Sequence, residues 1–256
     1  MKRKSQNITN RIWSCSAVAA LIVVWQAICM LGIVDSFMLP SPIQVVKAFV
    51  KEFSTLMQHS IITLSEAFIG LGLGILLGFG VAVLMDQFEK IYQACYPLIV
   101  LTQTIPTVAI APLLVLWFGY EMAPKIILIV LTTFFPITVG LLGGFRSVDI
   151  DSVNLLRAMG AGRWQIFWNI KFPGAMSQFF AGLRISASYA VVGAVISEWL
   201  GGFGGLGVYM TRVKKAYSFD KMFAVIFLIS IISLLLMKSV DLLQKEFMPW
   251  EKERNK

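Results

Sequence analysis

The chain has 256 residues, of which 57% are hydrophobic and only 14% are charged, and its mean hydropathy is +0.78. Soluble domains carry about 25% charged residues, so this composition excludes an ordinary water-soluble protein and indicates that lipid surrounds much of the chain. The formal charge of +8 would suit a nucleic-acid binder, but the placement of the basic residues is that of a membrane protein.

Six apolar runs are long enough to cross a bilayer, which takes about 20 residues. The first run is too long for the apolar part of a secretory signal and no small-residue cleavage site follows it, so we expect a retained helix. The runs lie at about 13–34, 61–85, 93–118, 124–145, 177–199 and 221–243.

The basic residues predict the orientation of these spans. With the N-terminus in the cytoplasm, 15 of the 22 Lys and Arg residues lie on the inner side and 7 on the outer side. An excess of Lys and Arg on the cytoplasmic side is the usual orientation signal. We therefore expect a cytoplasmic tail at 1–12, an all-α transmembrane domain at 13–245 and a second cytoplasmic tail at 246–256.

Glycines mark one face of the second span. Gly70, Gly74 and Gly78 repeat every four residues, and small residues let helix backbones approach closely in lipid. This face suits packing inside one subunit, and a seam between two subunits is the alternative. The chain contains no GxxxxGK[ST] segment, so we expect it not to hydrolyse nucleotide by that route itself.

Four polar or irregular positions in the spans are candidates for a translocation pathway. Pro106 should kink or break the third span next to Gln103, either as a purely structural kink or at the border of a path. Glu66 and Glu198 lie toward the outer ends of their spans, where both can face a water-filled funnel. The alternatives are a hydrogen bond from Glu66 to a neighbouring span, and pairing of Glu198 with a basic residue among Arg212, Lys214 and Lys215.

The outer halves of the spans show these two acids and no basic residue, which favours a neutral or weakly cationic solute over an anion. Five glycines within residues 201–207 cannot hold an ordinary helix, so we expect a re-entrant or hinge segment at the outer face.

A polar segment at about 146–173 interrupts the apolar pattern on the inner side. Asp149, Asp151 or Ser152 can cap a short helix that ends at Met159, and Gly160 supplies a left-handed stop. A second short helix should follow at about 163–170, and Pro173 should end the segment before the fifth span. Two short helices at an angle would project a small knob suited to docking a water-soluble partner.

This segment resembles the EAA loop of permease subunits from binding-protein-dependent ABC importers. Gly160 takes the motif's glycine position, Ile170 its isoleucine, and Phe172-Pro173 its Leu-Pro ending, whereas Asn154-Leu155-Leu156 replaces Glu-Ala-Ala. Other segments resemble the branch that imports sulfonates, taurine, nitrate and pyrimidine precursors. They are residues 105–113, with two prolines, and Glu198-Trp199-Leu200-Gly201.

The resemblance implies a type I importer permease with six transmembrane helices and a cytoplasmic coupling loop. It implies a cytoplasmic ATPase that carries ATP and Mg²⁺, an extracytoplasmic solute-binding protein and a second permease copy in the cell membrane. No cofactor, metal or catalytic residue is expected on this chain. The coupling residues would be Asn154, Leu155, Leu156, Arg157, Ala158, Met159, Gly160, Ala161, Phe172 and Pro173.

Segments around Ser65-Glu66-Ala67 and Ser197-Glu198-Trp199 look most like permeases for hydroxymethylpyrimidine, a thiamine precursor, with a sulfonate, taurine or nitrate permease as the alternative. A secondary transporter or channel that needs no ATPase is a more remote alternative, because no repeat of two halves is visible. A membrane enzyme is disfavoured because His59 is the single histidine and no HExxH or GxSxG motif occurs.

Overall fold

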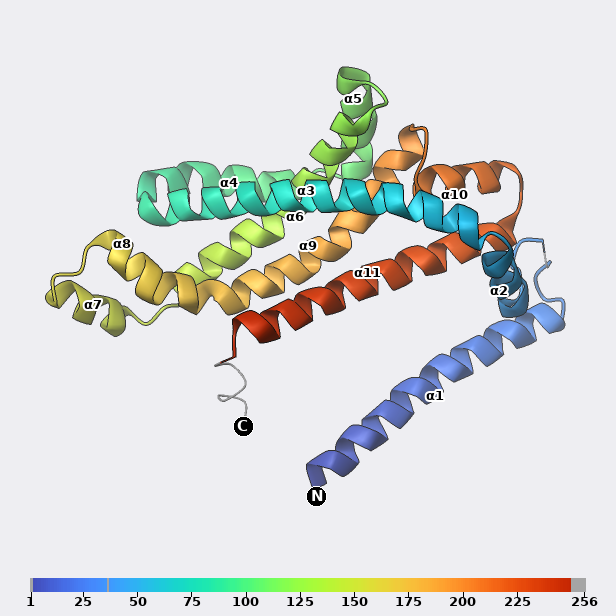
Figure 1. Cartoon of the computed structure of the whole chain (residues 1–256), viewed down its shortest axis with the longest axis horizontal. Coiled ribbons are helices and arrows are strands. Elements are labelled where there is room, and N and C mark those ends of the chain that lie inside the picture. Colours follow the sequence, from blue (N-terminus) through green and yellow to red (C-terminus); the bar gives the residue numbers. More distant parts are fainter. Residues whose placement is uncertain (1, 36, 250–256) are drawn as a thin grey trace. The chain divides into compact units, whose positions relative to one another are not determined.

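The computed structural model describes residues 2–35 and 37–249, with side chains described for Trp13, 16–35 and 37–249. Within these ranges the regular structure is helical throughout (Figure 1). In chain order the helices are α1 (Lys2–Met30), α2 (Pro42–Lys51), α3 (Phe53–Gln87), α4 (Glu89–Thr104), α5 (Thr107–Phe118), α6 (Met122–Arg146), α7 (Ile150–Ala158), α8 (Arg163–Ile166), the π-helix η1 (Phe167–Lys171), α9 (Phe172–Leu200), α10 (Leu206–Lys215) and α11 (Phe219–Phe247).

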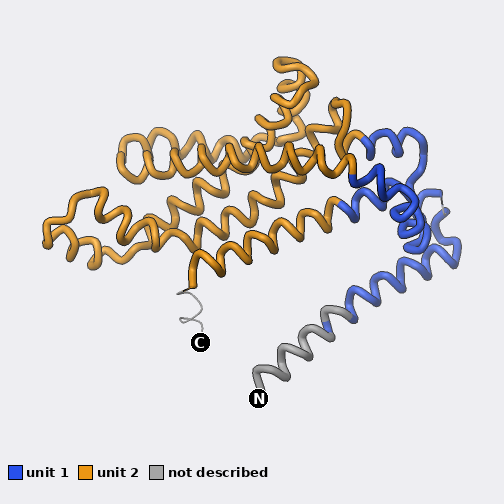
Figure 2. Tube along the Cα trace, viewed as in Figure 1, with its two compact units in different colours: residues 1–57, 209–228 blue, residues 58–208, 229–256 orange. Residues whose placement is uncertain are grey.

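The chain divides into two compact units, residues 1–57 with 209–228 and residues 58–208 with 229–256 (Figure 2). In the first unit Trp25 packs on Phe223 and Phe227, with ring centroids 5.9 and 5.8 Å apart. A hydrogen bond from Lys221, 2.6 Å from Glu52, holds the pKa of the Glu52 carboxyl below its usual value. The second unit contains helices α4 to α9 and most of α3.

The described helices reproduce most, but not all, of the predicted spans. By length and composition α3, α6, α11 and the continuous run Arg163–Leu200 can each cross a membrane. The α4–α5 pair would be a fifth span, but it is bent by 97°. The first run lies in α1, and its described apolar part, Ser16–Met30, is by itself shorter than a span requires, so a sixth span stays a prediction. Helix α1 also begins at Lys2, where a tail was expected, and residues 250–256 of the second expected tail lie outside the described residues.

Close packing of α6 against α9 forms the centre of the second unit. A Cβ added to Gly144 of α6 would lie 2.6 Å from Cα of Ala175, and one added to Gly140 would lie 2.8 Å from the Gln178 carbonyl oxygen. A Cβ added to Gly182 of α9 would likewise clash with the Pro136 carbonyl oxygen. Because backbone rather than flexible side chains fills these places, only glycine allows this approach.

The glycine face of α3 packs on α6. A Cβ on Gly70 would lie 2.5 Å from Ile129, and one on Gly78 would lie 3.0 Å from Ile137, while Gly74 is in contact with Thr133. This confirms packing of the face inside one chain rather than at a seam between copies. Gly72, on another side of α3, has open space beside it.

The predicted break at Pro106 is confirmed. Helix α4 ends at Thr104, α5 begins at Thr107, and Ile105 and Pro106 between them are extended. The Thr104 hydroxyl donates to the Leu101 carbonyl at 2.8 Å, and the Thr102 hydroxyl donates to Ile99 at 2.6 Å. Leu101 is among the last four residues of α4, whose carbonyls have no intrahelical partner, so the bond from Thr104 satisfies one of these carbonyls.

A buried carboxylate network joins α3, α6, α9 and α10. The Glu66 carboxylate lies 2.6 Å from Nζ of Lys125, and Glu198 accepts hydrogen bonds from the Thr63 hydroxyl at 2.7 Å and the Gly207 amide at 2.6 Å. Glu66, Lys125 and Glu198 are 3%, 5% and 1% exposed, so hydrogen bonds within the protein replace their contacts with water. We call these five residues the carboxylate network.

The same network holds the glycine-rich segment that follows α9. The amides of Gly205 and Leu206 donate to Nδ1 of His59 at 3.0 Å and to the Thr63 hydroxyl at 2.8 Å. Gly205 has φ +115° and touches the Glu198 carboxylate, so a side chain has no room there. The segment is a loop over residues 201–205 that leads directly into α10.

Two expectations about the acids are therefore wrong. Glu198 is buried and accepts its hydrogen bonds from Thr63 and Gly207, so the predicted interfacial pairing with a basic residue does not occur. Lys125 lies in the first turn of α6, so the span ends that we expect to lie outside do contain a basic residue. The alternative for Glu66, a bond to a neighbouring span, is confirmed by its contact with Lys125.

We predict that Gly74→Ala destabilises the protein while Gly72→Ala does not. Both changes gain about 1 kcal/mol of helix propensity, but the methyl at position 74 must enter the space of Thr133, and overpacking costs about 1–3 kcal/mol. Thermal unfolding of the two purified variants in the same detergent measures the difference. Equal stability of the pair would contradict the close α3–α6 packing.

We predict that Lys125→Met destabilises the protein strongly, because it leaves the Glu66 carboxylate buried without a cation. Removing one partner of a buried pair costs about 3–5 kcal/mol. The double variant Lys125→Met with Glu66→Gln should recover most of the loss, since the uncompensated charge is then gone. Thermal melts would refute the role of the pair if the single and double variants unfold at the same temperature.

Candidate functional site

The segment 146–173, which we call the elbow, begins with a capped helix. Asp149 accepts hydrogen bonds from the Ser152 hydroxyl at 2.7 Å and from the amides of Ser152 and Asp151 at 3.1 and 3.3 Å. These bonds, that from the Ser152 hydroxyl first, hold the pKa of Asp149 below its usual value. The carboxylate therefore stays ionised at neutral pH, and the cap of α7 is lost only as the pH falls through that lowered pKa.

Gly160 ends α7 as the sequence predicts. Its φ is +85°, its amide donates to the Arg157 carbonyl at 2.9 Å, and the Ala161 amide donates to Leu156 at 2.9 Å. This pair of bonds is the Schellman motif, which requires a left-handed residue at the glycine position. Open space surrounds Gly160, so its glycine is needed for backbone conformation and not for packing.

The end of the elbow differs from the expectation. Pro173 does not separate the second short helix from the fifth span, because α8, η1 and α9 form one continuous helical run from Arg163 to Leu200. The π-helix η1 makes this possible, since the Phe172 amide bonds to the Phe167 carbonyl five residues back. Pro173 then falls in the first turn of α9, where its missing amide costs little.

One side of the elbow is fixed to the helices of the second unit. Nζ of Lys171 lies 2.7 and 2.9 Å from the two carboxylate oxygens of Asp86, at the end of α3. Phe167 is buried, with its ring centroid 5.3 Å from that of Phe145 of α6. Sequence reasoning missed Asp86, whose only signal was an acid directly after the second predicted span.

The other side of the elbow is not covered by the rest of the described chain. Leu155, Met159 and Trp164 are 62%, 76% and 58% exposed, although all three are large and apolar. Exposed apolar surface beside charged residues is typical of a protein–protein contact. A hollow of about 780 Å³ adjoins it, lined by Asp86, Gln87, Phe88, Glu89, Lys90, Ile91, Arg157, Arg163, Ile166 and Lys171.

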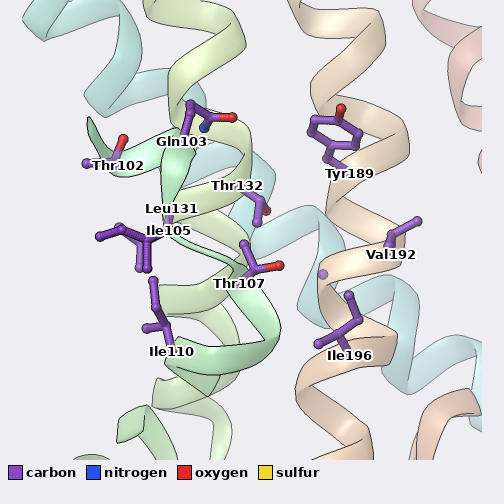
Figure 3. A pocket seen from close by; sticks show the side chains of 11 residues that line it. Thr102, Gln103, Ile105, Thr107, Ile110, Leu131, Thr132, Tyr189, Val192 and Ile196 are labelled. Atoms are coloured by element: carbon purple, nitrogen blue, oxygen red, sulfur yellow. The ribbon is translucent and has the colours of Figure 1, made fainter. Parts of the chain in front are cut away.

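A second site is a cavity of about 280 Å³ at the break between α4 and α5 (Figure 3). Helices α6 and α9 complete its walls. It is lined by Thr102, Gln103, Ile105, Thr107, Ile110, Leu131, Thr132, Tyr189, Val192, Gly193 and Ile196, none of which is charged.

The cavity contains only part of the predicted pathway. Gln103 lines it, and Pro106 lies at the break between two lining residues. Glu66 and Glu198 belong instead to the carboxylate network and do not line this cavity. Thr132 and Tyr189 were not singled out from the sequence, because a lone hydroxyl in an apolar run carries no spacing signal.

Residues 70–250 match the model of a protein family described as the binding-protein-dependent transport system inner membrane component. The formylaminopyrimidine transport permease of Halalkalibacterium halodurans is 38% identical over 91% of this chain and 94% of its own length. The taurine transport system permease of Escherichia coli is 30% identical over 94% of this chain and 90% of its own length.

Solved structures agree on the fold. An inward-facing structure of the MetNI methionine ABC transporter contains a chain that superposes with a TM-score of 0.67 at 19% identity, covering 75% of this chain and 95% of that one. The family match, the curated relatives and the helical fold agree with one another. The chain belongs to the family of binding-protein-dependent transport system inner membrane components and is a permease subunit of an ABC importer.

Proposed function

We propose that two copies of this chain form the membrane pathway of an importer driven by ATP hydrolysis on a separate subunit. Each elbow would dock on one cytoplasmic ATPase, which binds ATP and Mg²⁺. The observation that carries the proposal is the elbow itself, whose expected coupling residues Leu155 and Met159 are exposed while Lys171 and Phe167 fix it to α3 and α6.

The elbow is built to transmit a movement. Because α8, η1 and α9 are continuous, a displacement of the elbow by the ATPase would be carried along α9. Helix α9 lines the cavity with Tyr189, Val192 and Ile196, so such a displacement would reshape the cavity. Rigid-body movement of this kind is a common basis for alternating access.

The remaining partners follow from the same proposal. An extracytoplasmic binding protein would deliver the solute to the opposite face of the cell membrane. The elbow contains Arg157, Arg163 and Lys171, and its basic character supports a cytoplasmic location for it and for both termini.

For the solute, we infer a pyrimidine precursor of thiamine, such as hydroxymethylpyrimidine. The formylaminopyrimidine permease is 38% identical to this chain, whereas the taurine permease and the putative aliphatic sulfonate permease of Bacillus subtilis are each 30% identical. The uncharged cavity also favours a neutral solute over an anion.

We predict that Gly160→Val uncouples ATP hydrolysis from uptake. A β-branched residue is strained at φ +85°, by about 1–2 kcal/mol for a left-handed conformation, so the exposed tip of the elbow should change shape. The coupling is measured by comparing solute uptake with the ATPase activity that the binding protein stimulates in the reconstituted complex.

Gly162→Val is the matched control, because Gly162 has an extended backbone with φ −71° and an added Cβ would lie 3.8 Å from Oε1 of Gln165, an ordinary contact. It should retain coupled uptake. Normal uptake by the Gly160 variant would show that the elbow does not transmit the movement.

The solute is tested in a strain that lacks this chain. We predict that uptake of labelled hydroxymethylpyrimidine is lost while uptake of ethanesulfonate is unchanged, and that the intact chain restores the pyrimidine uptake. If the strain loses only the uptake of sulfonate, the solute is a sulfonate and not the pyrimidine.

A further inference from the structure

The cavity between α4, α5, α6 and α9 is lined by polar side chains that make no hydrogen bond to the described part of the chain. The Gln103 amide, the Thr107 hydroxyl and the Tyr189 hydroxyl line it, and none of them makes a hydrogen bond to another described residue. Figure 3 shows Gln103 and Thr107 on one side and Tyr189 on the facing helix. Polar groups directed into a recess without a protein partner are available to a ligand.

Two more hydroxyls have a restricted role. The Thr132 hydroxyl donates to the Ile129 carbonyl at 2.8 Å, and the Thr102 hydroxyl donates to Ile99 at 2.6 Å. Each hydroxyl has one hydrogen, so both oxygens can offer only acceptor lone pairs to the cavity. A ligand there meets acceptors from the threonines and both donors and an acceptor from Gln103.

The remaining walls are apolar and lie on opposite sides. Ile105 comes from the α4–α5 break and Ile110 from α5, and Val192 and Ile196 come from α9 (Figure 3). Such walls favour a ring with apolar faces whose hydrogen-bonding groups lie on its edge.

The cavity offers nothing to an anion. None of its lining residues is charged, and the buried ammonium of Lys125 is held by Glu66 at 2.6 Å. An anion would lose its hydration without gaining a cation, whereas an uncharged ligand loses only hydrogen bonds that Gln103 and Tyr189 can replace.

We propose that this cavity is a selectivity site for uncharged ring solutes that carry both N–H donors and ring-nitrogen acceptors, and that Gln103, Thr107 and Tyr189 bind their polar edge. The proposal rests on the proposed function, because it places the transported pyrimidine in the membrane subunit. It adds that the permease itself discriminates against sulfonates, independently of the binding protein.

The test is direct binding to the permease–ATPase complex in lipid nanodiscs with no solute-binding protein present. Equilibrium dialysis with labelled hydroxymethylpyrimidine should show saturable binding, and labelled ethanesulfonate should show none. Gln103→Leu should weaken pyrimidine binding about tenfold, the effect of losing a hydrogen bond worth about 1.4 kcal/mol. Thr104→Val is the matched control and should bind as the wild type does, because its hydroxyl bonds to Leu101 and does not line the cavity.

A gain-of-binding variant separates selectivity from misfolding. Gln103→Lys introduces a cation, so it should acquire measurable ethanesulfonate binding and lose affinity for the pyrimidine. The inference is overturned if Gln103→Leu binds the pyrimidine like the wild type, or if the wild type binds both probes equally.

ATP-driven uptake by the wild-type complex, measured in parallel with its binding protein, distinguishes the two proposals. Pyrimidine uptake together with unaltered binding by Gln103→Leu would overturn this inference and leave the proposed function standing. Absence of pyrimidine uptake by the wild type would overturn the proposed solute, and with it this inference.

Discussion

The close approach of α6 and α9 is the constraint on which the second unit depends. Hydrophobicity gives no drive for helix association in lipid, so packing and buried polar contacts must hold the helices together. Gly140, Gly144 and Gly182 remove the side chains that would separate the two backbones. The Ser186 hydroxyl then donates to the Thr133 carbonyl across the interface at 2.8 Å. With this pair fixed, α3 packs its own glycine face on α6.

Helix α9 joins the functional parts because of this packing. It continues from the elbow through η1, lines the cavity in its middle and contributes Glu198 of the carboxylate network from its last turn. The Asp86–Lys171 contact holds one end of α3 to the elbow, and the Glu66–Lys125 pair holds α3 to α6 nearer its other end. In the mechanism that we propose, a movement of the elbow would reach the cavity through a bundle that is held together near both ends.

The sequence predicted features that rest on local chemistry. The capped start of α7, the left-handed Gly160, the break at Pro106 and the Gly70–Gly74–Gly78 face each follow from residues close together in the chain. Features that rest on distant partners were missed or wrong. Lys125 was overlooked although it lies at the start of the fourth predicted run, and only the fold brings it to Glu66. Pro173 was expected to end the elbow because a π-helix has no sequence signal strong enough to predict it.

The central claim is that force enters this permease from a separate ATPase through the elbow. Its most direct test is accumulation of labelled hydroxymethylpyrimidine in proteoliposomes, with the chain alone or together with its ATPase, binding protein and ATP. We expect accumulation against a gradient only in the complete system. Accumulation by the chain alone would show that no separate ATPase drives the import.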